Sequence, residues 1–181
     1  TPELKCPSTI LTPSPTILLA TDTPCLGSDT SSPNTNSIFS GSIGDSAGAA
    51  KLAKVGTGTL TLDGTSTYTG TTTVSAGTLL INGSLGTTAI AVNNTGTLGG
   101  SNGTIGSGTA SVMLNTGGTL APGNSPGALT VNGTVSLNSG STYAYQYTGG
   151  GSTADLVDVN GLLTINAGAI LTLEDLAAAY H

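Results

Sequence analysis

Gly58-Thr59-Leu60 is the first copy of a short phrase that returns along this chain at steps of 19, 19, 22, 22 and 28 residues. The later copies, the last two of them degenerate, are Gly77-Thr78-Leu79, Gly96-Thr97-Leu98, Gly118-Thr119-Leu120, Gly140-Ser141-Thr142 and Gly168-Ala169-Ile170. Repetition at such a period is typical of a solenoid, in which each unit buries its apolar face only by stacking on the next one.

The phrase also predicts which side chains face inward. Neighbouring side chains of a strand point to opposite faces, so the apolar residue of each copy and the threonine before it must lie on opposite faces of the sheet. We expect an inward column formed by Leu60, Leu79, Leu98, Leu120 and Ile170. We expect an outward column formed by Thr59, Thr78, Thr97 and Thr119. The pattern predicts an all-β fold, a parallel β-solenoid of about six rungs and roughly 30 Å in length.

Two further patterns support this fold. Asp-Gly or Asn-Gly pairs recur as turn signals, because both residue types accept a positive φ; they are Asp63-Gly64, Asn82-Gly83, Asn102-Gly103, Asn132-Gly133 and Asn160-Gly161. Residues 131–140 are echoed 28 positions later by residues 159–168, with Val135 matching Leu163 and Leu137 matching Ile165. The extra residues of that step fall in the glycine-rich stretch 148–153, as expected of a loop on the outside of a solenoid.

The first 35 residues form a separate Pro/Thr-rich arm with two apolar phrases, which contain Ile10 and Leu11, and Ile17, Leu18 and Leu19. Proline tolerates only edge or extended positions of a sheet, so this arm is either a flexible leader or an extended segment docked on a sheet edge. Cys6 and Cys25 are the only cysteines and predict a disulfide loop; two free thiols are the alternative. The expected organisation is therefore an arm at 1–35, a solenoid at 36–173 and a tail or cap at 174–181.

Composition excludes several classes of function. The net charge is −6, arginine is absent and there are three lysines, so nucleic acid is not an expected partner. No apolar run approaches the roughly 20 residues that span a bilayer. Only 7% of the 181 residues are charged and 3% are aromatic, which suits stacked aliphatic columns better than an ordinary globular core.

The sequence predicts no catalytic, cofactor-binding or metal-binding site. His181, the last residue, is the only histidine, so the chain offers no other histidine to act as the general base of a serine or cysteine nucleophile. Asp155 and Asp158 come nearest to a carboxylate pair, but their odd spacing points them to opposite faces of a strand, and calcium needs more oxygen ligands. We therefore expect a protein that is not an enzyme. A polysaccharide-degrading β-helix is the weakest alternative, because no basic residue follows Lys54 until the terminal histidine.

Tyr143, Tyr145 and Tyr147 share one strand face, at positions i, i+2 and i+4. If exposed, the rings would suit a glycan or a protein partner, since tyrosine combines apolar area with a polar tip. Alternatively, they cover the edge of a widened rung beside the glycine-rich loop.

Residues 54–64, with the following Thr67–Val74 and Ala76–Leu79, resemble the passenger-associated repeat of bacterial autotransporters. Leu120–Val131, which contains Pro122-Gly123-Asn124-Ser125-Pro126-Gly127, is similar to another hallmark of those passengers, and Ile38–Ile43 resembles the usual lead-in. The resemblance covers about residues 36–173. It implies a right-handed β-helix outside the cell or on a bacterial surface, often part of an adhesin or a stalk. A C-terminal membrane barrel is not found in these residues, and the Pro-rich arm is not part of the usual passenger pattern.

These observations together predict a non-catalytic extracellular structural protein, acting as a stalk, an adhesin segment or a self-assembling fibre subunit. In the fibre hypothesis, residues 8–20 dock on the end rung of a neighbouring copy and extend it head to tail. A surface module that binds a host or matrix glycan or protein is the alternative.

Overall fold

The computed structural model describes residues 9–11, 16–20, 36–45, 48–123, 127–148 and 153–176, the first two segments as backbone alone. Their regular structure consists of strands; no α-helix occurs among them. The strands are β1 Thr9–Leu11, β2 Thr16–Ala20, β3 Ser37–Phe39, β4 Ser42–Gly44, β5 Lys51–Val55, β6 Thr59–Leu62, β7 Thr65–Ser66, β8 Thr72–Val74, β9 Gly77–Ile81, β10 Ser84–Leu85, β11 Ala89–Val92, β12 Gly96–Gly99, β13 Gly103–Leu114, β14 Thr119–Leu120, β15 Ala128–Leu137, β16 Thr142–Tyr147, β17 Leu156–Val159, β18 Leu163–Ile165 and β19 Ile170–Asp175.

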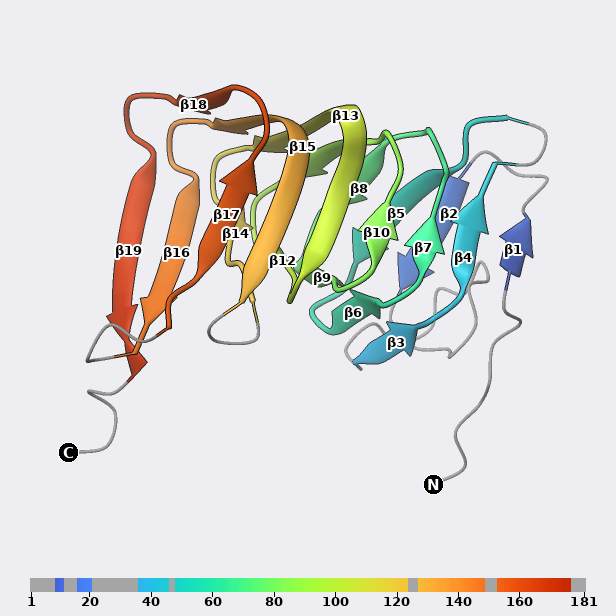
Figure 1. Cartoon of the computed structure of the whole chain (residues 1–181), viewed down its shortest axis with the longest axis horizontal. Helices are drawn as coiled ribbons and strands as arrows, with labels where there is room; N and C mark the ends of the chain where they lie inside the picture. Colours follow the sequence, from blue (N-terminus) through green and yellow to red (C-terminus); the bar gives the residue numbers. More distant parts are fainter. Residues whose placement is uncertain are drawn as a thin grey trace.

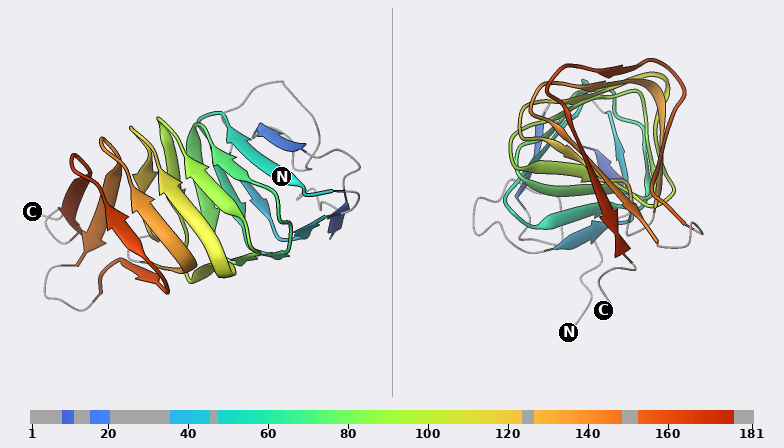
Figure 2. Two further views of the ribbon diagram at one scale, coloured as in Figure 1. Left: turned by 90° about the horizontal axis from the view of Figure 1, so that it is seen from above. Right: turned by 90° about the vertical axis from the view of Figure 1, so that its left-hand side faces the viewer.

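The chain winds into a parallel β-solenoid, which confirms the predicted fold class. One wall is a seven-stranded sheet in the order β19-β16-β14-β12-β9-β6-β3, and a ten-stranded sheet from β17 to β2 forms the other walls. Every pairing between these strands is parallel, so each coil of the chain lies over the previous one (Figure 1). Seen along the axis, the coils superpose around one interior (Figure 2, right).

The repeated phrase forms the predicted columns over its four close copies. Leu60 pairs with Leu79, Leu79 with Leu98 and Leu98 with Leu120. All four leucines are buried, whereas the threonines that precede them pair in register on the opposite face of the sheet. Burial of each large aliphatic side chain contributes about 1.5–3 kcal/mol, so the column is a principal source of stability.

The prediction for the two degenerate copies was wrong by one residue. Leu120 pairs with Tyr143, and Tyr143 with Leu171, so Leu171 continues the leucine column while Ile170 continues the threonine column. The cause lies in the glycines. Gly140 and Gly168 have φ angles of 74° and 87°, and they occupy the turn position of Gly117 (φ 76°), one residue before the glycine of the phrase.

The Asn-Gly pairs lie at corners, as expected, but for a different reason. Among the five pairs only Asn102 has a positive φ, of 62°. The glycines are required because a Cβ at Gly83, Gly133 or Gly161 would run into a backbone carbonyl oxygen of the coil below. Close stacking of corners, rather than backbone handedness, selects glycine at these positions.

The interior is mainly apolar, and its largest group of hydrogen-bonded side chains is formed by Tyr68, Thr72 and Thr88. The hydroxyls of Tyr68 and Thr72 are 2.6 Å apart, Thr88 Oγ1 lies 3.2 Å from Thr72 Oγ1, and Thr88 donates to the Gly70 carbonyl at 2.7 Å. No buried side-chain nitrogen or oxygen of the described residues lacks a hydrogen-bond partner. The core therefore accommodates these hydroxyls at little cost, because they satisfy one another.

Strand pairing extends to both ends of the described solenoid. At the N-terminal end, β1 pairs with β4 and β2 pairs with β5, both in parallel. At the other end β19 continues through Glu174 and Asp175. The described residues contain no helix that is long and apolar enough to cross a bilayer.

Candidate interaction surface at the C-terminal end

The last coil, formed by β17, β18 and β19, leaves its inner face uncovered. Leu163 and Ile165 continue columns whose previous members, Val135 and Leu137, are buried. The side chain of Ile165 is nevertheless 65% exposed and that of Leu173 is 66% exposed. These residues have inward positions, but no further coil covers them among the residues that the structure describes.

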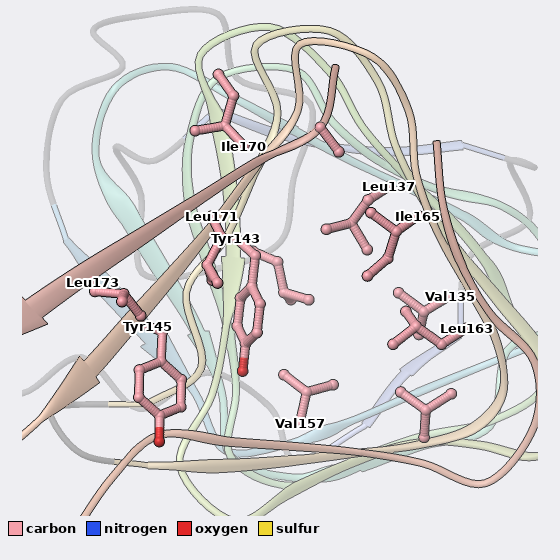
Figure 3. Close-up of a pocket in the computed structure, with 13 residues that line it drawn as sticks. Val135, Leu137, Tyr143, Tyr145, Val157, Leu163, Ile165, Ile170, Leu171 and Leu173 are labelled. Atoms are coloured by element: carbon pink, nitrogen blue, oxygen red, sulfur yellow. The ribbon is translucent and has the colours of Figure 1, made fainter. Parts of the chain in front are cut away.

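The uncovered face is a groove of about 430 Å³ (Figure 3). Its lining is aliphatic except for two tyrosines: Leu120, Val135, Leu137, Tyr143, Tyr145, Val157, Val159, Leu163, Ile165, Ala169, Ile170, Leu171 and Leu173. Seven of the nine exposed large apolar side chains among the described residues lie in this terminal region. A contiguous apolar patch of this kind marks an interaction site more often than scattered surface leucines do.

The three tyrosines of β16 belong to this end. Tyr143 and Tyr145 pack edge to face with ring centroids 6.2 Å apart, and the Tyr145 and Tyr147 centroids are 6.4 Å apart. Tyr143 packs against the buried core, and burial, with the nearby Asp155 carboxylate, raises the pKa of its phenol. Tyr143 occupies the leucine column, and Tyr143 and Tyr145 both line the groove, so a role of these rings in contact with a partner stays a prediction.

Asp155 has a structural role. Its carboxylate is 4% exposed and accepts hydrogen bonds from the backbone N–H of Gly127 and of Gln146, both at 2.9 Å. Asp158 lies on β17 and is exposed. Within the described segments no three His, Cys, Asp or Glu side chains gather as a metal site. The two aspartates thus serve different purposes: one joins neighbouring coils, and the other faces solvent.

A ladder of asparagine amides runs up one corner to this end, and sequence reasoning missed it. Asn115 donates to Asn93 at 2.8 Å, Asn138 to Asn115 at 3.1 Å, and Asn166 to Asn138 at 2.9 Å. At another corner Asn160 donates to Asn132 at 3.0 Å. The signal was present in the sequence, since an asparagine directly follows β11, β13, β15 and β18.

Each ladder ends with an unused acceptor. Asn160 and Asn166 donate amide N–H groups to the coil before them, and their Oδ1 atoms accept no hydrogen bond from the described residues. A following coil with an N–H donor at each of these corners would complete both ladders.

Charge is confined to the two ends of the described structure. No charged residue occurs between Gly64 and Ala154. Asp155, Asp158, Glu174 and Asp175 lie at the C-terminal end. At the other end Lys51 and Lys54 lie on β5, Asp45 follows β4 and Asp63 follows β6.

Lys54 is fully buried, which the sequence analysis did not foresee. Its Nζ donates to the carbonyls of Val55, Gly56 and Ala76 at 2.8, 2.8 and 3.0 Å. Burial lowers the pKa of this lysine to about 8. The ammonium group therefore joins two coils at a corner where a Cβ on Gly77 would meet it.

The structure places the other proposed contact residues in the arm. Ile10 and Leu11 of β1 pair with Ile43 and Gly44, and Ile17, Leu18 and Leu19 of β2 pair with Leu52, Ala53 and Lys54 of the same chain. Cys6 and Cys25 lie outside the described residues, so their disulfide stays a prediction.

The stacked parallel coils, with asparagine ladders and leucine columns, define a β-solenoid repeat protein. Residues 52–81 match the family model of the passenger-associated-transport-repeat, which confirms the resemblance drawn from the repeat motif. In the structure this segment runs from β5 to β9 and contains Tyr68 and Lys54. The search of curated proteins gave no match. The repeat supports a structural passenger-type segment that is secreted or exposed at a bacterial surface.

Proposed function

We propose that this protein is a non-catalytic rod of a bacterial extracellular structure, which holds other parts of that structure apart as a stalk or forms a fibre. The observation that carries the proposal is the continuous leucine column from Leu60 to Leu120, paired in register on every coil. A load applied along such a rod is shared by parallel backbone ladders and by the amide ladder of Asn93 to Asn166.

The chemistry of the chain favours a structural role over catalysis. The groove at the C-terminal end is lined with aliphatic groups, and the nearby Asp155 carboxylate is occupied by two backbone N–H groups. A glycoside-cleaving site would need a pair of carboxyl groups placed about a sugar bond, one of them free to donate a proton. The groove is better suited to a protein partner than to a polar sugar.

The test uses a break in the middle of the rod. Leu98→Asp places a carboxylate in the buried column, whereas Thr97→Asp places the same charge on the adjacent, outward-facing residue. We expect small-angle scattering to show a rod for the native chain and for Thr97→Asp, and proteolysis to cleave Leu98→Asp near its centre. A compact, non-elongated native chain would contradict the proposal, as would release of sugar from a panel of acidic polysaccharides.

A further inference from the structure

We propose that the C-terminal groove receives the N-terminal end of a second copy of this chain, so that solenoids join head to tail in register. The inference rests on the proposed structural role and specifies its partner. Three observations support it: the two ends present edges of the same sheets, the register matches their columns, and the amide and charge pattern fixes the direction.

The first observation is that, among the described strands, both large sheets have one edge strand at each end with no further partner. The seven-stranded sheet ends in β3 at one edge and in β19 at the other, and the ten-stranded sheet has β2 at one end and β17 at the other. Unpaired backbone groups at a strand edge are a template for further pairing. A second copy placed over the last coil would extend both sheets with parallel pairs of the kind already present.

The second observation is the register of the columns. Pair by pair, one column runs from Leu163 through Val135, Val112, Ile90, Thr72 and Leu52 to Ile17. A second column, two residues further along the same strands, runs from Ile165 through Leu137, Leu114, Val92, Val74 and Lys54 to Leu19. The arm residues Ile17 and Leu19 therefore hold the positions that follow Leu163 and Ile165 when one copy continues another.

The seven-stranded sheet matches at one of its two inward positions, because Ser37 rather than an apolar residue would follow Leu171. Its leucine column ends at Leu171 and begins at Ser37, which pairs with Leu60. Two residues further along each strand, Leu173 lies at one end and Phe39 at the other. Aliphatic or aromatic residues thus hold the next register position at three columns, and burial of the exposed apolar side chains there would favour association against its entropic cost.

The third observation excludes contact between two C-terminal ends. The ladders end in amide oxygens of Asn160 and Asn166, so two such ends would oppose acceptor to acceptor. They would also bring four carboxylates of one copy against four of the other. A head-to-tail contact instead places this acidic end against an end whose described charges balance, with Lys51 and Lys54 against Asp45 and Asp63. Such a heterologous contact does not close, and it propagates into a filament.

The test is a mixing experiment with two blocked ends of the full chain. The tail variant is Leu163→Asp with Ile165→Asp, and the head variant is Ile17→Asp with Leu19→Asp. Met113→Asp is the control, since Met113 is exposed and apolar but lies in the middle of a wall. Sedimentation velocity over a concentration series measures mass, electron microscopy measures length, and circular dichroism checks the fold of each variant.

We expect the native chain and Met113→Asp to form linear rods whose length grows with concentration. Each blocked variant alone stays monomeric, with a dissociation constant raised by about ten-fold or more, because association would bury carboxylates. An equimolar mixture of the two variants gives dimers and nothing longer, since one intact head meets one intact tail. If the head variant loses its β-sheet signal, deletion of residues 1–33 takes its place.

Three results would overturn the inference. They are a native chain that is monomeric at every concentration, a head variant that still associates, and filaments unaffected by the tail substitutions. A monomer that keeps the length of a rod in scattering would remove the partner proposed here and leave the structural role intact. Cleavage of the native chain at its centre would contradict the structural role itself.

Discussion

Replacing Thr95 with glycine is expected to stabilise the protein. Four turns at one corner begin with an asparagine whose carbonyl accepts a hydrogen bond from the residue three positions later, at 2.8–3.1 Å. The third residue of each turn has a positive φ: 65° at Thr95, 76° at Gly117, 74° at Gly140 and 87° at Gly168. Three of the four turns use glycine there, as this backbone conformation favours, and one uses a β-branched residue.

The magnitude follows from two opposing effects. A residue with a Cβ in the left-handed region costs roughly 1–2 kcal/mol. Glycine avoids that cost, but its greater freedom in the unfolded chain costs about 0.5–1 kcal/mol. The side chain of Thr95 is exposed, so little packing is lost. The net gain in the free energy of unfolding is about 0.5–1 kcal/mol, or about 1–4 °C in Tm for a chain of this size.

Urea unfolding followed by circular dichroism measures the effect through the midpoint at constant slope. Gly140→Thr is the reciprocal variant, because it creates the conflict that Thr95 has, with its new Cβ about 3.0 Å from Thr116 Cγ2. We expect Gly140→Thr to be destabilised by roughly 1–2 kcal/mol. If Thr95→Gly lowers the midpoint, the reasoning that this corner is strained at Thr95 fails.

Two further outcomes follow from buried or paired polar groups. Because Lys54 has a pKa of about 8 in the folded chain and 10.5 as its ordinary value, the unfolded chain binds more protons between these values, so stability should rise with pH from about 8. The rise should end near pH 10, because burial raises the pKa of Tyr68, so that above this pH its phenol ionises only in the unfolded chain. We expect Lys54→Met to flatten the rise of the urea midpoint between about pH 8 and 10. An unchanged dependence on pH in this variant would refute Lys54 as the cause. Asn138→Asp should cost about 1–2 kcal/mol in urea unfolding, because it replaces the N–H that reaches Asn115 by a second acceptor. Ser139→Asp adds the same charge to the next, exposed residue and should cost little; equal losses in the two variants would mean that charge, not the ladder, is responsible.

The fold could be predicted from the sequence because the solenoid repeats its chemistry. The spacing of Gly-Thr-Leu predicts the columns, and the echo of residues 131–140 in 159–168 predicts the pairing of Val135 with Leu163. The one-residue shift of the columns at Gly140 could not be predicted from the sequence. A glycine can be required for its positive φ or for a close contact, and the sequence does not distinguish these two cases. Backbone geometry distinguishes the two, and it assigns Gly140 to the turn.

The candidate site was harder to predict for a different reason. The tyrosines of β16 are predicted as contact residues because they are aromatic. The groove, however, is formed mainly by aliphatic residues that the sequence alone assigns to the core. Ile165 and Leu173 are exposed because they lie on the last coil that the structure describes, and sequence pattern alone does not distinguish that coil from the buried ones. The burial of Lys54 was within reach of sequence reasoning, since Lys54 lies two residues from the buried Leu52 and therefore on the same face of β5.

Parallel stacking also explains why charge is absent from the middle of the rod. Residues in one column lie about 4.8 Å apart. Two equal charges at the same position of neighbouring coils would therefore repel each other by about 1 kcal/mol even in water. An amide avoids this cost, because it donates to the coil below and accepts from the coil above. A carboxylate can only accept, so it can start such a ladder without being able to continue it. Asp63 does this where Asn82 donates to it at 3.0 Å. The same restriction gives the rod a direction: the amide oxygens of Asn160 and Asn166 face the C-terminal end, where only a coil that offers donors can follow.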